Sequence, residues 1–168
     1  TDVFHWITEG LKRNMRIVSY DREGKWFSES TKDSITSEFY ANQLHQLLEN
    51  SGEKPPYILV GHSMGGPYNQ IFRDLYPNEV KGMVFLDSSH PEQWKRLGVN
   101  GLIEDNQITE MKIFATLADM GIMGVYNKIM NPKSMSENLP EDCQNRKMNL
   151  LLYSGDVYRR TLKENNIN

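Results

Sequence analysis

Several features that define other classes of protein are scarce in this chain of 168 residues. Cys143 is the only cysteine, which excludes an internal disulfide and a cysteine-rich zinc site. No apolar run approaches the roughly 20 residues that cross a bilayer, and residues 1–6 do not resemble a secretion signal. The formal net charge of -3 leaves no basic excess to neutralise phosphates. We therefore expect no membrane span, no nucleic-acid partner and a cytoplasmic location.

Short apolar runs alternate with amphipathic stretches in the first half of the chain, and this alternation is typical of βαβ units in a parallel sheet. Each run has the length of a buried strand and is followed by polar or glycine residues. The three runs are residues 15–20, 57–61 and 82–87. Because crossovers in such units are right-handed, we predict that the three strands are parallel.

Two helices are predicted between these strands, because apolar residues recur there at helical spacing. The recurring residues are Tyr40, Leu44, Leu47 and Leu48 in the first helix, and Tyr68, Ile71, Phe72 and Leu75 in the second. Gly52 ends the first helix. Pro67 fits the first turn of the second helix, and Pro77 ends it.

The second half of the chain contains no predicted strand. Residues 108–120 and 141–152 have a helical pattern. We therefore predict a partial βαβαβ core over residues 1–98 and a helical cap or lid over residues 99–168. The methionines between residues 111 and 130 either line an apolar ligand pocket or form the core of this cap.

A six-residue motif follows the second predicted strand directly: Gly61-His62-Ser63-Met64-Gly65-Gly66. Gly-x-Ser-x-Gly between a strand and a helix is the pattern of a nucleophile elbow, a sharp turn that exposes a serine hydroxyl. Glycines on either side of a strained serine leave space for the close backbone, and Gly66 extends that clearance. The motif predicts that Ser63 is a nucleophile and that the Met64 N–H donates to an oxyanion.

The same glycines would also suit a flexible βα loop or a phosphate-binding turn at a helix N-terminus. A phosphate site would be better served by a Walker-type lysine or by the wider glycine spacing of a dinucleotide site, and the sequence has neither. We therefore favour the elbow.

Beyond this motif, the chain resembles the α/β-hydrolase superfamily, in its serine esterase and haloperoxidase-like branch. Residues 20–28 resemble the loop after strand four, with Trp26 where a second glycine is usual, and residues 83–92 resemble strand six and its loop. The resemblance implies an α/β fold with a partial parallel sheet, covering strands four to six plus the helical cap. A complete sheet of this fold needs roughly 200–250 residues, so we expect a partial domain.

The resemblance also implies a catalytic acid after strand seven and a histidine after strand eight, and we expect both outside this chain. Asp87 or Asp156 remains an alternative acid, the latter if residues 153–156 end a disguised strand. His90 remains an alternative base, although a role in stabilising its loop is preferred. The other histidines, His5, His45 and His62, are expected at packed or exposed positions without a catalytic role.

The function implied by the resemblance is that of a serine hydrolase. It would cleave a carboxylic ester or related acyl bond in a small molecule, through an acyl-enzyme on Ser63, with the Met64 N–H in the oxyanion hole. No cofactor and no metal are expected. The alternative is a catalytically incomplete remnant or small-molecule-binding module that lacks the acid and the histidine. The sequence gives no indication of oligomeric state.

Overall fold

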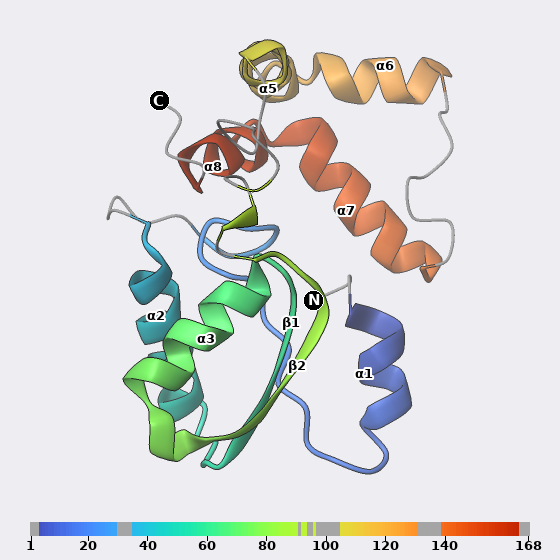
Figure 1. The fold of residues 1–168 in the computed structure, drawn as a ribbon. Helices are drawn as coiled ribbons and strands as arrows, with labels where there is room; N and C mark the ends of the chain where they lie inside the picture. Colours follow the sequence, from blue (N-terminus) through green and yellow to red (C-terminus); the bar gives the residue numbers. More distant parts are fainter. Residues whose placement is uncertain are drawn as a thin grey trace. The chain divides into compact units, whose positions relative to one another are not determined.

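The computed structural model describes residues 4–29, 35–90, 92–93, 96, 105–130 and 139–164. The chain divides into two compact units, one formed by Lys32–Leu102 and the other by Thr1–Thr31 together with Ile103–Asn168. The labels of helices and strands used below are those of Figure 1. The predicted boundary between core and cap, at residue 98, lies outside the described residues.

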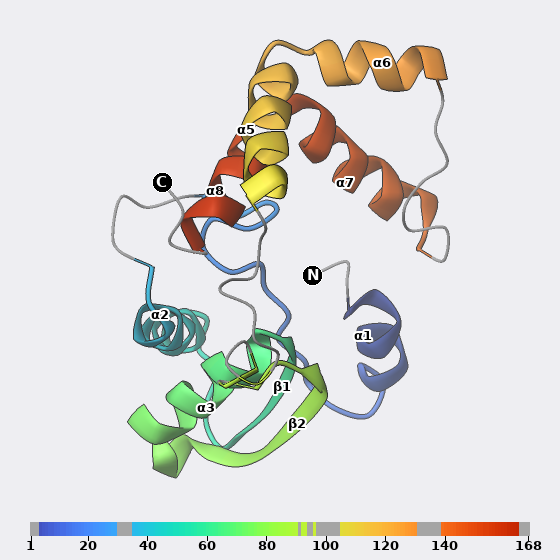
Figure 2. The ribbon, with the colours of Figure 1, turned by 45° about the horizontal axis from the view of Figure 1, so that its top comes forward.

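The unit of Lys32–Leu102 contains a two-stranded parallel sheet of β1 (Tyr57–Ser63) and β2 (Val80–Ser88). The strands are joined by α3 (Gly65–Leu75) and the short 3-10 helix η2 (Pro77–Glu79). α3 packs on both strands, and α2 (Ser37–Asn50) packs on α3. Figures 1 and 2 show α2 and α3 on the same side of the sheet. The second and third predicted strands and their parallel direction are therefore confirmed.

Both predicted helices form where the apolar spacing places them. The Thr36 hydroxyl accepts a hydrogen bond from the Phe39 N–H at 3.1 Å and caps the start of α2. The buried faces of α2 and α3 meet through Tyr40 and Tyr68, whose ring centroids lie 4.9 Å apart, and Phe72 is fully buried. The buried apolar residues of this unit are Tyr40, Ala41, Leu44, Leu48, Leu59, Tyr68 and Phe72.

The two faces of β1 differ in burial. Leu59 and Gly61 are buried on the face that packs against α3, whereas Ile58 and Val60 point to the other face and are 62% and 44% exposed. This difference follows from the period of two in a strand. The opposite face of the sheet in this unit therefore presents apolar side chains to solvent.

The strand predicted over residues 15–20 is wrong, because this segment is irregular in the structure. Met15 and Val18 are largely exposed, and the sheet of the described residues contains only β1 and β2. A short apolar run has the composition of a strand, but a strand also needs a neighbour to hydrogen-bond, and composition cannot supply one. The predicted three-stranded sheet is thus reduced to two strands.

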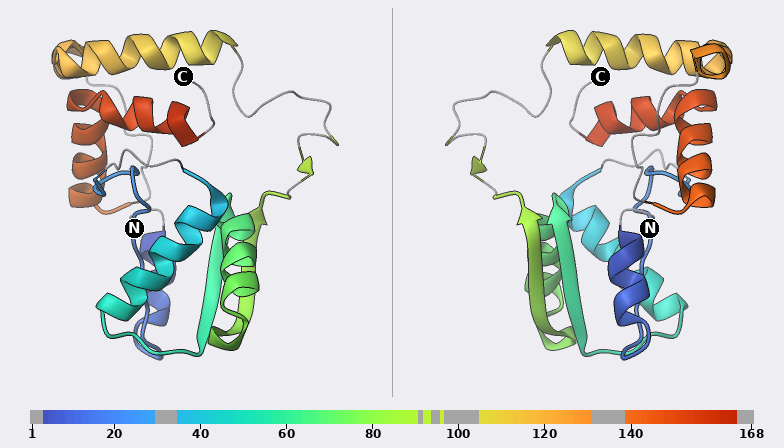
Figure 3. Two further views of the ribbon diagram at one scale, coloured as in Figure 1. Left: turned by 90° about the vertical axis from the view of Figure 1, so that its left-hand side faces the viewer. Right: turned by 90° about the vertical axis from the view of Figure 1, so that its right-hand side faces the viewer.

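The regular elements of the second unit, in the part that the structure describes, are all helices. It contains α1 (His5–Leu11), α5 (Asp105–Asp119), α6 (Ile122–Met130), α7 (Glu141–Tyr153) and α8 (Asp156–Glu164). α5 packs against α6, α7 and α8, and Figure 3 shows α5 running alongside α8. The buried apolar residues are Ala115, Ala118, Cys143, Leu152 and Leu162. The helices predicted within residues 108–120 and 141–152 are confirmed.

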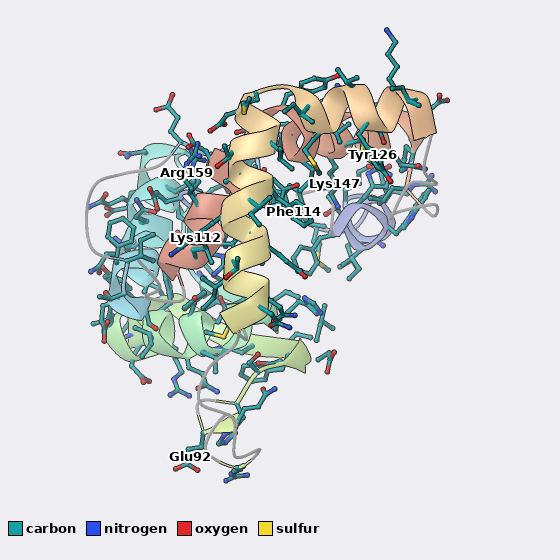
Figure 4. The ribbon with its side chains drawn as sticks, turned by 90° about the horizontal axis from the view of Figure 1, so that it is seen from above. Glu92, Lys112, Phe114, Tyr126, Lys147 and Arg159 are labelled. Carbon is teal, nitrogen blue, oxygen red and sulfur yellow. The ribbon has the colours of Figure 1, made fainter. Side chains whose placement is uncertain are left out.

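A polar contact ties the end of α5 to the turn between α7 and α8. Asp119 accepts a hydrogen bond from the Gly155 N–H and another from the Arg159 guanidinium, each at 2.8 Å. The hydrogen bond from Arg159, followed by that from Gly155, lowers the pKa of Asp119. Figure 4 labels Arg159, which lies beside α5. The carboxylate therefore joins two segments that are distant in the sequence.

The loop at residues 21–28 closes on itself and is held by α7 and α8. The Ser28 hydroxyl donates to the Asp21 carbonyl at 2.5 Å, and Arg160 donates to the Ser28 carbonyl at 2.6 Å. The Lys147 ammonium lies 5.2 Å from the centroid of the Trp26 ring. Trp26 has a φ of 44°, in the left-handed region that favours glycine. This backbone explains why a glycine would suit the position better.

No helix in the part of the chain that the structure describes combines the length and the apolar character needed to cross a bilayer.

Candidate active site

Ser63 lies where β1 ends, and α3 begins two residues later at Gly65. Its φ is 52°, a left-handed value that non-glycine residues adopt at a cost of about 1–3 kcal/mol. A serine in this conformation between a strand and a helix has the geometry of a nucleophile elbow. The alternative of a flexible βα loop does not account for a serine held in a left-handed conformation.

The two glycines that flank Ser63 have different surroundings. A Cβ on Gly61 would lie 2.6 Å from the carbonyl carbon and oxygen of Gly65, and backbone cannot move aside cheaply. A Cβ on Gly65 would meet nothing within 4 Å. The prediction of a close approach is therefore confirmed at Gly61 and wrong at Gly65. The turn folds the start of α3 over Gly61, two residues before the serine, and Gly65 itself faces open space.

The second close approach occurs one residue later, at Gly66. A Cβ on Gly66 would overlap the Ser88 Oγ and lie 2.7 Å from the Ser88 Cβ. Gly66 is buried, as the sequence leads one to expect for a glycine that extends the clearance into the helix. Ser88 ends β2, so this contact joins the first turn of α3 to the neighbouring strand.

The start of α3 provides backbone N–H groups beside Ser63. Met64 is the N-cap, and the first hydrogen bond of the helix runs from the Tyr68 N–H to the Met64 carbonyl at 3.3 Å. The N–H groups before Tyr68 have no partner within the helix, and Pro67 has no N–H at all. The Met64 N–H directly follows the serine at this helix start, and its role as an oxyanion donor stays a prediction.

The end of β2 is irregular beside the elbow. His62 pairs with Leu86, but Ser63 pairs with Ser88, so Asp87 is an extra residue on β2. Asp87 also has a left-handed backbone, with a φ of 44°. The Ser89 N–H donates to the Ser63 carbonyl at 3.0 Å. Ser88 and Ser89 were not predicted to belong to this site, since their only signal in the sequence is two small residues after a predicted strand.

None of the described histidines is hydrogen-bonded to Ser63. His62 is exposed on β1, and the His90 Nδ1 accepts from the Glu92 N–H at 3.1 Å within its own loop. Figure 4 shows Glu92 in the segment after β2. His45 stacks on Tyr76 with ring centroids 3.9 Å apart, and its Nε2 lies 3.0 Å from Glu79. His90 thus has the local contact expected of a loop residue, and His45 is a packed residue of α2.

The two alternative acids lie in different places. Asp87 belongs to the unit that carries Ser63, whereas Asp156 belongs to the helical unit. The idea that residues 153–156 end a strand is wrong, because α7 ends at Tyr153 and α8 begins at Asp156. The Asp156 carboxylate accepts from Arg159 at 2.8 Å within α8. Asp156 lies in the first turn of α8, where the helix dipole favours a negative charge.

Metal-binding groups are not clustered in the described part of the chain, where no set of three or more histidine, cysteine, aspartate or glutamate side chains is arranged to hold an ion. The shifts in pKa that burial causes belong to tyrosines. Burial raises the pKa of Tyr158, whose hydroxyl donates to the Leu151 carbonyl at 3.0 Å. The hydroxyls of Tyr158 and Tyr57 thus bond backbone carbonyls, which is a structural contact.

The parallel strands and the connecting helix fit a partial α/β-hydrolase core, and the sequence comparison agrees. A family model described as alpha/beta hydrolase fold matches residues 1–116, and the chain belongs to this family. A solved structure of a probable hydrolytic enzyme from Pseudomonas aeruginosa has a TM-score of 0.64 to this chain at 21% identity. That match covers 98% of this chain and 53% of the other, and it supports the fold. A two-stranded sheet fits a partial core.

Curated relatives match about half of this chain. The chain is 32% identical over 92 residues to an uncharacterized protein, YbdG, of Bacillus subtilis, covering 55% of this chain and 28% of the relative. It is 29% identical to an AB hydrolase superfamily protein of Gibberella zeae, covering 61% and 38%. It is 30% identical to Methylesterase 9 of Arabidopsis thaliana, covering 46% and 30%. The chain spans about a third of the length of these relatives.

Proposed function

We propose that this chain carries the nucleophile of a serine hydrolase that cleaves a carboxylic ester or related acyl bond in a small molecule. The observation that supports this function best is Ser63, held with a φ of 52° between β1 and α3. Two relatives named methylesterases favour an ester over other acyl bonds. The parent α/β-hydrolase family supports hydrolysis in general.

In this proposal the Ser63 Oγ attacks the carbonyl carbon of the ester, and a base takes the hydroxyl proton. The carbonyl oxygen becomes an anion that the Met64 N–H stabilises by a hydrogen bond. The intermediate then collapses, its bond to the alcohol oxygen breaks, and the alcohol leaves with the proton. Water attacks the remaining acyl-enzyme in the same way, releasing the acid and restoring Ser63. Asp87 and His90 remain candidates for the acid and the base beside residues outside the chain.

The test is covalent labelling with a fluorophosphonate, which reacts with activated serines. The probe should label the unmodified chain at Ser63, and a peptide map by mass spectrometry should locate the adduct there. Ser63→Ala should abolish labelling, and the exposed control Ser51→Ala should leave it unchanged. Labelling that persists in Ser63→Ala would overturn the assignment of the nucleophile.

A second candidate function is binding without turnover, by a module that kept the elbow but lacks the rest of the triad. This alternative is favoured by the absence of a histidine bonded to Ser63 among the described residues. Loss of the base costs several orders of magnitude in rate, because the hydroxyl keeps its proton. Hydrolysis of p-nitrophenyl acetate separates the two: turnover that Ser63→Ala removes supports the enzyme, and adduct formation without turnover supports the incomplete module.

A further inference from the structure

The end of β2 is shaped around the elbow by one inserted residue. From Ile58 and Gly82 to His62 and Leu86 the strands pair residue by residue, and then Asp87 is left without a partner so that Ser88 stands opposite Ser63. Bulges are rare in parallel pairs and common next to active sites, where they redirect a side chain. Two adjacent strand ends thus each hold one non-glycine residue in the left-handed region, Ser63 and Asp87.

The insertion decides which residue faces the elbow. In a strand the side chains alternate between faces, so a shift of one residue exchanges them. With the bulge, the Ser88 side chain occupies the space over Gly66, where a Cβ of Gly66 would overlap its Oγ. Without the bulge, Asp87 would stand opposite Ser63 in place of Ser88.

The residues after the bulge also hold the carbonyl of the serine. The Ser89 N–H donates to the Ser63 carbonyl at 3.0 Å. The Ser88 hydroxyl donates to the Ser89 carbonyl at 3.0 Å and lies 3.5 Å from the Ser63 carbonyl oxygen. Ser88 therefore contacts the peptide unit that follows Ser63 on one side and the first turn of α3 on the other.

We propose that Ser88 is a positioning residue for Ser63. Its side chain packs over Gly66 and its hydroxyl braces the Ser89 backbone that bonds the Ser63 carbonyl, so both the serine and the Met64 N–H are held in place. This role rests on the proposed function of Ser63 as the nucleophile. Ser88 itself does not touch the substrate, and its effect on the reaction passes through the geometry of the elbow.

The test measures the rate of fluorophosphonate labelling of Ser63 against probe concentration. Ser88→Ala should lower the maximal labelling rate by about 10-fold, because small displacements of a reacting group are costly. The probe concentration that gives half of the maximal rate should stay unchanged, since binding is not altered. Ser51→Ala is the control and should keep the full rate. A Ser88→Ala variant that is folded and labels at the full rate would overturn the proposal.

A size exchange tests the contact directly. Gly66→Ala alone should lower the labelling rate, because its methyl group collides with the Ser88 side chain. Adding Ser88→Gly should bring the rate back to that of Ser88→Gly alone and no further, since the obstructing Cβ and Oγ are removed together with the hydroxyl that braces Ser89. Additive losses in the double variant would contradict the proposed contact.

An NMR measurement separates this proposal from the proposed function. If Ser88 positions the elbow, Ser88→Ala should shift the Met64 amide signal and speed hydrogen exchange of the Ser89 amide, while Ser51→Ala should change neither. If the unmodified protein does not label at Ser63, the nucleophile assignment fails, and these amide signals still decide whether Ser88 positions the turn. Unchanged Met64 and Ser89 amides in Ser88→Ala would overturn the positioning role.

Discussion

Gly61 and Gly65 flank Ser63 symmetrically in the sequence but have different neighbours in space. Gly61 lies against the backbone of Gly65 and Gly66, whereas a side chain at Gly65 would have room. The pattern Gly-x-Ser-x-Gly therefore combines one glycine that sterics require with one that sterics do not. The two glycines of the motif therefore have different structural roles.

This difference predicts opposite effects on stability. Gly61→Ala should lower the free energy of unfolding by roughly 2 kcal/mol or more, because its Cβ forces the backbone of the turn apart. Gly65→Ala should raise it by about 0.5–1 kcal/mol, since alanine favours the helix and restricts the unfolded chain. Urea unfolding followed by circular dichroism checks both variants. Equal destabilisation by the two substitutions would refute the crowding at Gly61.

Asp119 provides a prediction about pH. The hydrogen bonds from Arg159 and Gly155 lower its pKa in the folded state from the ordinary value of 3.8. Its contribution to stability is therefore present above that ordinary value and is lost as the pH falls through the lowered folded pKa. Asp119→Asn should reduce the Tm at pH 6, and the difference from the unmodified protein should shrink as the pH falls through the lowered folded pKa of Asp119.

The control for this prediction is Glu110→Gln, an exposed carboxylate on the same helix. It should not reproduce the change in the pH dependence of Tm. A constant difference in Tm between Asp119→Asn and the unmodified protein from pH 6 down to pH 2 would show that the charge of Asp119 does not stabilise the contact.

At the scale of elements, the helix α2 depends on its first turn. Thr36 accepts a hydrogen bond from the Phe39 N–H, which would otherwise have no partner in the helix. Thr36→Ala should lower the free energy of unfolding by about 1 kcal/mol, and Thr36→Ser should keep most of it because the hydroxyl remains. Chemical denaturation of the three proteins measures the differences. If serine and alanine destabilise equally, the hydroxyl is not the cause.

Elements whose signal is local could be predicted from the sequence, and those that depend on pairing could not. The helices α2 and α3 follow from apolar spacing, and the turn from β1 into α3 follows from the glycines around Ser63. The run at residues 15–20 has the same local composition as β1 but pairs with no strand in the described structure. The bulge at Asp87 arises only when β2 is aligned with β1, so no property of β2 alone reveals it.

The candidate site shows the same difference between residues with a local sequence signal and residues whose contacts depend on strand pairing. Ser63 and Met64 could be predicted as site residues because a strand, a turn and a helix meet there in consecutive residues, and their roles stay predictions. Ser88 was missed because its importance comes from Gly66, 22 positions earlier in the numbering of the chain. The expectation of crowding at Gly65 was wrong because clearance depends on which way the first turn of α3 faces.

At the scale of the whole molecule, two compact units have separate cores. Phe72 of α3 is fully buried in the unit that carries the sheet, whereas Ala115, Cys143 and Leu162 are buried in the helical unit. Phe72→Ala should cost about 3–5 kcal/mol within its own unit, since it leaves a cavity. Hydrogen exchange should quicken first in α2, α3 and β1, while amides of α5 and α7 keep their protection.

The comparison variant is Phe114→Ala on α5, where the side chain is 39% exposed and its ring lies 5.9 Å from that of Tyr158. It should leave the protection of α2, α3 and β1 unchanged. If Phe72→Ala quickens exchange in both units to the same extent, the two units unfold together as one cooperative structure.

The lone buried Cys143 gives the protein a reporter that needs no engineering. Its thiol is 3% exposed on α7, and the chain has no second cysteine to react in its place. A thiol reagent can therefore modify the chain only when the region around α7 opens, and the modification rate at low denaturant measures how often that happens. Time-resolved mass spectrometry, which detects the single added group by its mass, would therefore measure the rate at which this helical unit opens.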